Sequence, residues 1–279
     1  MKLIKKLLAL ALAVAMTAAL AACGGSPAPA DSTAPAENAA PVESAGDVSE
    51  TPVAPGKTYL IATDTTFAPF EFQDADGNFV GIDMDLLKAI AEDQGFQYEI
   101  QVLGFDASLQ SVQSGQSDGM IAGMSITDAR KEIFDFSDPY FDSGVVMGIK
   151  ADNEEIKGYE DLKGKNVAIK KGTEGAAFAE SIMDQYGFTV TYFADSSNMY
   201  EDVKSGNSAA CFEDYPVLGY AISQDIGLKI VTEMERGNSY GFAVNKGRNP
   251  ELIEMFNAGL KNLRDSGRYQ EILDTYIKK

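Results

Sequence analysis

The sequence predicts an α/β fold with two lobes, each built on a mostly parallel sheet flanked by helices. Short apolar segments alternate with amphipathic ones from Lys57 onward, as expected when strands alternate with helices. The alternation restarts near residue 160, so that two α/β halves of about 90 residues follow each other. The chain has 279 residues, of which 45% are hydrophobic, and this suffices for two modest domains.

The first half shows the strand and helix patterns in turn, with Gly and Asp at the ends of segments. The predicted elements are a strand at 57–64, a hairpin at 70–82 with its turn at Asp76-Gly77, a helix at 83–95, a strand at 98–104, a short helix at 109–115 and a buried strand at 117–125.

The second half repeats this order and adds a helical C-terminus. The predicted elements are strands at 166–170, 188–194 and 208–216, a helix after the first of them, helices at 197–206 and 218–227, a strand at 240–247 and a pair of helices at 251–277.

The N-terminus has the pattern of a secretory signal. Three lysines precede the apolar residues 7–22, a stretch too short and too rich in alanine for a good membrane span. The motif Leu20-Ala21-Ala22-Cys23 resembles the bacterial lipobox, which implies cleavage before Cys23, its lipidation and attachment to the extracytoplasmic face of the cell membrane. An ordinary signal with a chance cysteine is the alternative. Residues 23–56 are rich in Ala, Pro, Ser, Glu and Gly and predict a flexible tether.

Composition excludes several classes of function. The net charge of −19 becomes −22 once the three signal lysines are removed, and so acidic a protein is a poor partner for nucleic acid. There is no histidine, and the cysteines are Cys23 and Cys211. With Cys23 lipidated, no internal disulfide can form, and Cys211 is expected to be a small core residue. We expect no cofactor and no metal site.

Candidate binding residues fall where strands give way to helices, because ligands of α/β sheets bind outside the carboxyl ends of the strands. In the first half these junctions are 64–70, 105–107 and 123–130, and in the second half they are 170–175 and 213–216.

Arg130 raises a question at one of these junctions. Ser125, Thr127 and Asp128 favour a helix start, which places Arg130 in the first turn, where the helix dipole disfavours a cation by about 0.3–1 kcal/mol. One interpretation is a surface ion pair with Asp128 or Asp135. The other is that Arg130 and the free N–H groups together bind an anion.

The motifs around these junctions resemble a known family. The segments are ATDTTFAPFEF, GNFVGIDMDLLKAIA, SITDARKEIFDFSDPYF, DLKGKNVAIKKGT and CFEDYP. Together they are similar, from about Tyr59 to the C-terminus, to the type II periplasmic solute-binding proteins of amino-acid ABC importers. The resemblance implies two lobes that close on a ligand, joined by crossovers near 143–149 and 238–244. Lobe 1 would comprise 57–144 and 241–279, and lobe 2 would comprise 145–240.

The resemblance also implies how the ends of an amino acid would be held. Arg130 matches the arginine that binds the α-carboxylate, helped by Ser125 and, across the cleft, by the amide of Thr173. Asp214 matches the carboxylate that binds the α-ammonium, with the carbonyl of Gly123 as a second acceptor. From the residues alone, Asp214 could instead be a turn residue before Pro216.

Four further positions match residues that contact the ligand side chain. Phe67 and Phe105 correspond to an aromatic pair that sandwiches its aliphatic part, although both could be ordinary core residues. Asp64 and Lys170 correspond to polar contacts. Asp64 could instead cap the next turn, and a slip of one residue in the strand would turn Lys171 inward in place of Lys170.

This pair favours glutamine as the ligand. Asp64 would accept from the carboxamide NH2 and Lys170 would donate to its carbonyl, whereas Lys170 repels a basic side chain and Asp64 an acidic one. Glu174 and Glu213 depart from the family pattern, and their roles are open.

We expect a monomeric receptor that delivers its ligand to an ABC permease. Two alternatives are a sensor that docks on a receptor, and a dehydratase-like enzyme in which Glu213 or Glu174 would act as the acid or base.

Overall fold

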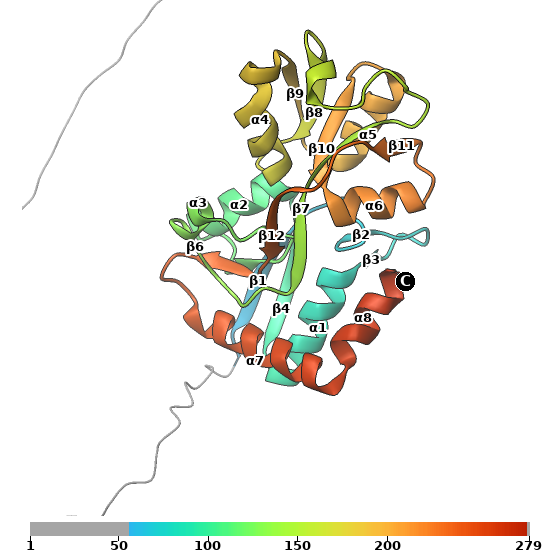
Figure 1. The fold of residues 1–279 in the computed structure, drawn as a ribbon. Helices are drawn as coiled ribbons and strands as arrows, with labels where there is room; N and C mark the ends of the chain where they lie inside the picture. Colours follow the sequence, from blue (N-terminus) through green and yellow to red (C-terminus); the bar gives the residue numbers. More distant parts are fainter. Residues whose placement is uncertain (1–55, 278–279) are drawn as a thin grey trace, which may run out of the picture. The chain divides into compact units, whose positions relative to one another are not determined.

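The computed structural model describes residues 56–277. The predicted signal peptide, the lipidated Cys23 and nearly all of the tether lie outside the described residues. Two sheets, each with its own core, organise the described part (Figure 1). The structure therefore confirms the predicted two-lobed α/β fold class.

The first sheet has five strands in the order β4-β1-β5-β13-β6. They are β1 (Thr58–Thr63), β4 (Gln97–Val102), β5 (Gly119–Met120), β6 (Phe134–Phe136) and β13 (Ala243–Asn245). The accompanying elements are the small hairpin β2 (Phe72–Gln73) and β3 (Phe79–Val80), and the helices α1 (Ile82–Gln94), α2 (Phe105–Ser114), α3 (Asp128–Lys131), α7 (Pro250–Ser266) and α8 (Arg268–Tyr276).

The second sheet has six strands, in the order β11-β7-β10-β8-β9 with β12 paired to β7. They are β7 (Phe141–Lys150), β8 (Asn166–Lys170), β9 (Thr189–Phe193), β10 (Ala210–Asp214), β11 (Leu228–Ile230) and β12 (Glu235–Tyr240). Its helices are the short 3₁₀ helix η1 (Tyr159–Leu162), α4 (Glu174–Tyr186), α5 (Ser196–Ser205) and α6 (Tyr215–Ser223).

Both sheets are mixed. Parallel pairs form where a helix returns the chain to the end of the sheet at which the previous strand began. These pairs are β1 with β4 and β5, and β8 with β9 and β10. Antiparallel pairs involve β7 in the second sheet and β13 in the first. Each sheet thus contains parallel pairs, and the antiparallel pairs are added where the chain passes from one sheet to the other.

The strands β7 and β12 connect the two halves. They pair antiparallel, with Tyr240 opposite Phe141 and Asn238 opposite Ser143, and Figure 1 shows them running between the two sheets. The predicted strand at 240–247 is divided at Gly241, because the chain leaves β7 there and enters the first sheet as β13. The residues before Gly241 pair in the second sheet and those after it pair in the first. Local sequence does not reveal this change of partner.

Helix ends follow the predicted glycines. Gly95 and Gly187 end α1 and α4 in the left-handed conformation, which glycine adopts without steric cost. Gly259 serves packing instead. A Cβ there would lie 2.8 Å from a side-chain carbon of Ile90, so glycine permits the close contact of α7 with α1.

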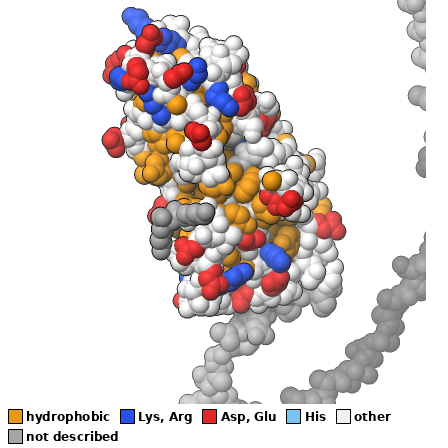
Figure 2. Space-filling model, turned by 90° about the vertical axis from the view of Figure 1, so that its right-hand side faces the viewer, with side chains coloured by type: hydrophobic (Ala, Val, Ile, Leu, Met, Phe, Trp, Pro, Cys, Tyr) orange, Lys and Arg blue, Asp and Glu red, His pale blue; other side chains and the backbone are white. Residues whose placement is uncertain are grey.

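The apolar residues of the predicted strands and helices form the buried cores of the two halves. Cys211 is free and buried in β10, as predicted. Figure 2 shows hydrophobic side chains across the middle of the folded part and charged ones towards its two ends. No helix within residues 56–277 is long and apolar enough to cross a membrane.

Candidate functional site

The candidate site lies between the two sheets, where residues from both halves line a small cavity. Its volume is about 10 Å³, roughly the space of one water molecule. The lining residues are Phe67, Phe105, Gly123, Ser125, Arg130, Thr173, Glu174 and Asp214. Seven of the nine residues predicted to contact a ligand are in this set, and Glu174 is the addition.

Local structure aims Arg130 into the cleft. The Thr127 side chain caps α3 by accepting from the Arg130 N–H at 3.3 Å. The guanidinium then donates to the carbonyl of Ser125 at 2.9 Å and, across the cleft, to the carbonyl of Gly172 at 3.0 Å. Its Cζ lies 5.4 Å from the ring centroid of Phe105. Neither Asp128 nor Asp135 pairs with it in the described part of the chain, so the arginine is a cleft residue and not part of a surface pair.

The charge of Arg130 is balanced from the second half of the molecule. Burial lowers the pKa of the guanidinium, and the nearby carboxylates of Glu174 and Asp214 oppose this. Glu174 Oε1 lies 3.8 Å from Arg130 Nη2. The guanidinium therefore faces two carboxylates that belong to the second half of the molecule, one at the start of α4 and one at the end of β10.

Asp214 ends β10 and is almost fully buried. The hydroxyl of Tyr240, on the crossover strand β12, donates to its Oδ2 at 2.6 Å, and Ser143 on β7 donates to Tyr240 at 3.0 Å. Burial and the neighbouring Glu213 raise the pKa of Asp214 to about 7, while Tyr240 and Arg130 act to lower it. A cation placed here would be favoured, because it would stabilise the ionised form.

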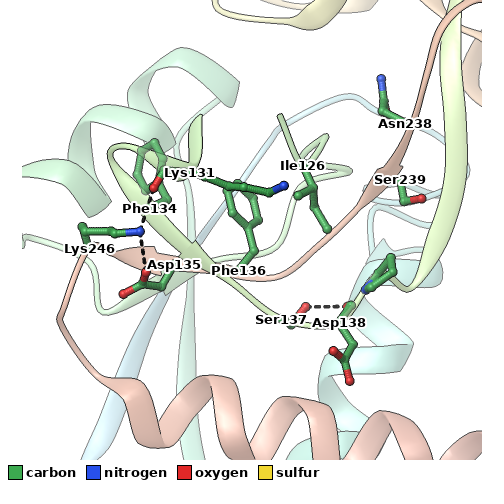
Figure 3. A pocket seen from close by; sticks show the side chains of 11 residues that line it. Ile126, Lys131, Phe134, Asp135, Phe136, Ser137, Asp138, Asn238, Ser239 and Lys246 are labelled. Atoms are coloured by element: carbon green, nitrogen blue, oxygen red, sulfur yellow. Dashed lines mark hydrogen bonds and ion pairs between the residues drawn. The ribbon is translucent and has the colours of Figure 1, made fainter. Parts of the chain in front are cut away.

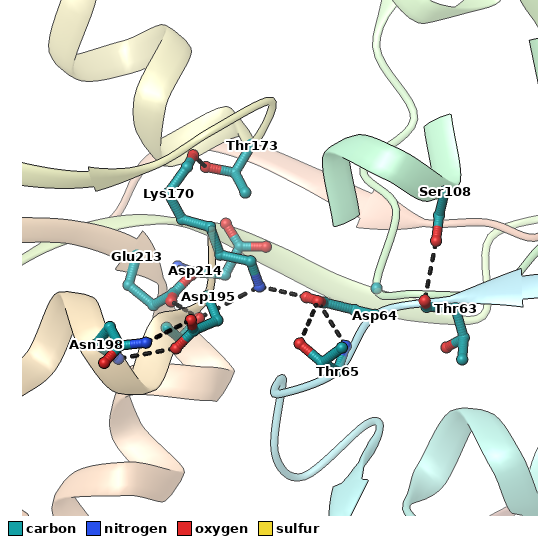
Figure 4. Close-up of polar contacts among 12 residues, drawn as sticks. Thr63, Asp64, Thr65, Ser108, Lys170, Thr173, Asp195, Asn198, Glu213 and Asp214 are labelled. Atoms are coloured by element: carbon teal, nitrogen blue, oxygen red, sulfur yellow. Dashed lines mark hydrogen bonds and ion pairs between the residues drawn. The ribbon is translucent and has the colours of Figure 1, made fainter. Parts of the chain in front are cut away.

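Asp64 and Lys170 meet across the cleft, as Figure 4 shows. The Lys170 ammonium donates to Asp64 Oδ2 and to the hydroxyl of Ser196 at 3.3 Å. Both side chains are buried, at 1% and 0% exposure, and neither lines the cavity. Burial acts to lower the pKa of Lys170, but Asp64 and Glu213 outweigh it and raise the pKa overall. Lys170 therefore keeps its positive charge, and Asp64 is the side chain that pairs with it.

The register of β8 decides which lysine points inward. Lys170 is buried against Asp64 and lies 4.8 Å from the Phe67 ring centroid. Lys171 is exposed and pairs with Asp106 at 2.8 Å. Successive side chains of a strand point to opposite faces, so only one of the two can enter the cleft.

Several residues that support the site were not predicted to belong to it. Glu213 accepts from Ser196 at 2.8 Å and from Tyr200 at 3.1 Å, which extends the Asp64–Lys170 pair into a buried network. Tyr240 holds Asp214 from the crossover. Two signals were available for Glu213, namely the junction at 213–216 and its departure from the family pattern. No local signal marked Ser196, Tyr200 or Tyr240, because these partners lie elsewhere in the sequence.

A wider groove lies apart from this site. It has a volume of about 610 Å³ and is lined by residues of α3, β6, β12 and the adjoining loops, including Lys131 and Phe136 (Figure 3). Lys246 at its edge is already paired with Asp135 at 3.0 Å and donates to the carbonyl of Lys131 at 2.8 Å. The groove lacks the opposed, buried charges of the cleft, so size alone does not make it the better candidate.

Comparison with known proteins agrees with the fold. The profile of the bacterial extracellular solute-binding proteins, family 3, matches residues 59–279. The arginine-binding extracellular protein ArtP of Bacillus subtilis (strain 168) is 30% identical to this chain over 269 residues, covering 96% of each.

Two solved structures show the same lobes. Substrate binding domain 2 of Lactococcus lactis GlnP, in open conformation, is 46% identical with a TM-score of 0.56, covering 81% of this chain and 98% of that one. An ancestral arginine-binding protein bound to glutamine is 39% identical with a TM-score of 0.73, covering 80% and 98%. A lower TM-score at higher identity is consistent with lobes held at a different angle. Fold, motif order and sequence similarity agree, and the chain belongs to the bacterial extracellular solute-binding proteins, family 3.

Proposed function

We propose that this protein captures a free amino acid in the cleft and delivers it to an ABC permease. The observation that carries the proposal is the convergence of Arg130, from the first half, and Asp214, from the second, on one cavity flanked by Phe67 and Phe105. An amino acid is a zwitterion, so it needs an anion site and a cation site close together, each shielded from water.

The interaction energies expected in such a site suffice for tight binding. Charge-assisted hydrogen bonds contribute about 1.5–3 kcal/mol each, and packing between aromatic rings adds a little more. Three or four such contributions, less the costs of association and closure, leave about 8 kcal/mol, which corresponds to a dissociation constant near 1 μM.

Entry requires the lobes to separate. A cavity of about 10 Å³ is much smaller than an amino acid, and β7 and β12 are the segments about which the halves could hinge. We propose the lobe boundaries predicted from the sequence, 57–144 with 241–279 and 145–240. The permease would recognise the closed form, because a ligand shifts the equilibrium towards the state that it binds better.

Glutamine is the ligand that the polar pair favours. Asp64 and Lys170 pair with each other in the absence of a ligand. A carboxamide would take the place of both partners, because its NH2 group would donate to Asp64 and its carbonyl would accept from Lys170. A guanidinium would meet the Lys170 ammonium and be repelled. An ancestral arginine-binding protein that is 39% identical to this chain was solved both with glutamine and with arginine. The similarity to ArtP makes arginine the main competitor.

Attachment to the outer face of the membrane through Cys23 is part of the proposal and rests on the motif LAAC. Incorporation of a labelled fatty acid that disappears in Cys23→Ala would support it.

Calorimetric titration of the purified protein with each standard amino acid tests the proposal. We expect glutamine to bind with a dissociation constant of about 1 μM and arginine at least about 100-fold more weakly, because a buried charge repulsion costs several kcal/mol. Absence of saturable heat from every amino acid would contradict amino-acid binding altogether.

Lys170→Met tests the choice of side chain. Glutamine affinity should fall about tenfold or more through loss of a charge-assisted hydrogen bond, while arginine affinity should rise because Asp64 is left without a cation. The matched control is Lys157→Met, which removes the same charge from an exposed side chain paired with Glu154 within the second half, and should leave both affinities unchanged. If Lys170→Met kept the preference of the wild type, Asp64 and Lys170 would not select the ligand. Since an unpaired buried carboxylate is destabilising, melting curves with and without arginine should accompany the titration.

A further inference from the structure

Glu174 occupies an unusual position for a carboxylate. It is the first residue of α4, directly after the capping residue Thr173, where a negative charge interacts well with the helix dipole. That benefit does not need a side chain that points into the cleft. Yet the Glu174 side chain is only 13% exposed, and it lines the cavity beside Arg130 and Asp214.

Two arginines share this carboxylate. Oε1 lies 3.8 Å from Arg130 Nη2, and Oε2 lies 3.8 Å from Arg236 Nη1. Arg236 is on β12 and is anchored to α4 itself, because it donates to Ser181 Oγ at 3.0 Å and lies 5.4 Å from the Phe178 ring centroid. The contact with Arg236 is therefore made within the second half, and the contact with Arg130 is made across the cleft.

The remaining contacts of Arg130 are neutral. Its two hydrogen bonds go to the carbonyls of Ser125 and Gly172. A ligand carboxylate that bound this guanidinium would lie beside Glu174 Oε1, and the two negative charges would repel each other. Arg236 offers Glu174 another partner when this happens.

We propose that Glu174 is a built-in competitor for Arg130, which pairs with the guanidinium until a ligand carboxylate displaces it towards Arg236. This inference rests on the proposed amino-acid binding. The same contact draws the lobes together without a ligand, so Glu174 both favours the ligand-free closed form and lowers the apparent affinity.

Glu174→Gln is the central test, with Glu180→Gln as the matched control. Glu180 lies on the same helix and is exposed, bonded to the Tyr192 hydroxyl, so its replacement removes the same charge away from Arg130. We expect Glu174→Gln to bind glutamine about 2- to 10-fold more tightly, the effect of losing one partly exposed ion pair, and Glu180→Gln to bind like the wild type. Weaker binding by Glu174→Gln, or an equal change in both variants, would overturn the proposal.

A second variant and a second measurement make the test specific. Arg236→Gln should weaken binding, because Glu174 then has Arg130 alone as a partner, and the effect should vanish in the Glu174→Gln background. In small-angle scattering without ligand, Glu174→Gln should be more expanded than the wild type and Glu180→Gln should not. If the wild type bound no amino acid, the proposed function would fail, yet the scattering comparison would still decide whether Glu174 holds the lobes together.

Discussion

Arg130→Ala is expected to abolish measurable amino-acid binding at micromolar concentrations while leaving the fold intact. Removal of one partner of a buried, hydrogen-bonded charge pair costs about 2–5 kcal/mol, equivalent to about 30- to several thousand-fold in affinity. The loss should be large here because the guanidinium would hold the α-carboxylate, and because the substitution leaves Asp214 without an opposing charge in the cavity and Glu174 with Arg236 alone.

Titration calorimetry with glutamine measures the effect, and circular dichroism confirms the fold. Arg268→Ala is the matched control. Arg268 is exposed at the start of α8, where it pairs with Glu271 at 2.9 Å, so its loss should change neither affinity nor fold. Glutamine binding by Arg130→Ala within tenfold of the wild type would show that the ligand carboxylate is held elsewhere.

Glu71→Gln is expected to stabilise the protein above about pH 6. Glu71 has no exposed surface, and neither of its carboxyl oxygens finds a donor within residues 56–277. Its neighbour is the carboxyl of Asp83, whose Oδ2 accepts from the Gly123 N–H at 2.8 Å and from Tyr140 at 2.9 Å, while Oδ1 has no donor in the same part of the chain.

The two carboxyls are within hydrogen-bonding reach, and a single proton between them resolves the conflict. Burial, followed by the charges of Asp83 and Asp64, raises the pKa of Glu71 well above its usual value. Burial also raises the pKa of Asp83 to about 6, but its hydrogen bonds from Gly123, Tyr140 and Glu71 limit the rise. We therefore infer that Glu71 is protonated at neutral pH and donates to Asp83, which in turn positions Gly123 at the cavity.

The effect on stability follows from proton binding. Above its unfolded-state pKa of 4.5 and below its folded-state pKa, Glu71 is protonated in the folded protein and ionised in the unfolded chain. The unfolded state then binds fewer protons, so stability falls as the pH rises through this window. Glutamine supplies the same donor without titrating, and should be more stable than the wild type by about 1–3 kcal/mol at pH 8 and similar to it near pH 4.

Urea unfolding from pH 4 to pH 8 measures this difference. Some decline should remain in Glu71→Gln, because Asp83 still titrates near pH 6. Glu99→Gln, at an exposed position of β4, should follow the wild type. The infrared C=O band of a protonated carboxyl should be present in the wild type at pH 7 and weaker in Glu71→Gln. Parallel stability curves, or a destabilised Glu71→Gln, would show that the buried carboxyl is ionised.

The sequence by itself determined the elements and the chemistry available to them. Apolar periodicity located the β-α alternation, and the left-handed caps at Gly95 and Gly187 end the helices that it predicted. Arg130 was identified in advance because a cation in the first turn of a helix conflicts with local preference. Asp214 was identified by its place at a strand-to-helix junction and by the resemblance to the family. These signals are local, since they depend on residues a few positions apart.

Tertiary structure alone decided how those groups pair. Lys170 and Asp64 are 106 positions apart, and their contact depends on the angle between two lobes that local sequence does not encode. The same is true of Glu174, which reaches Arg130 from across the cleft, and of Glu71, whose proton is required because a second buried carboxyl from α1 lies beside it. Electrostatic energies vary steeply with distance and burial, so the charge states of the cleft emerge only once both lobes are in place.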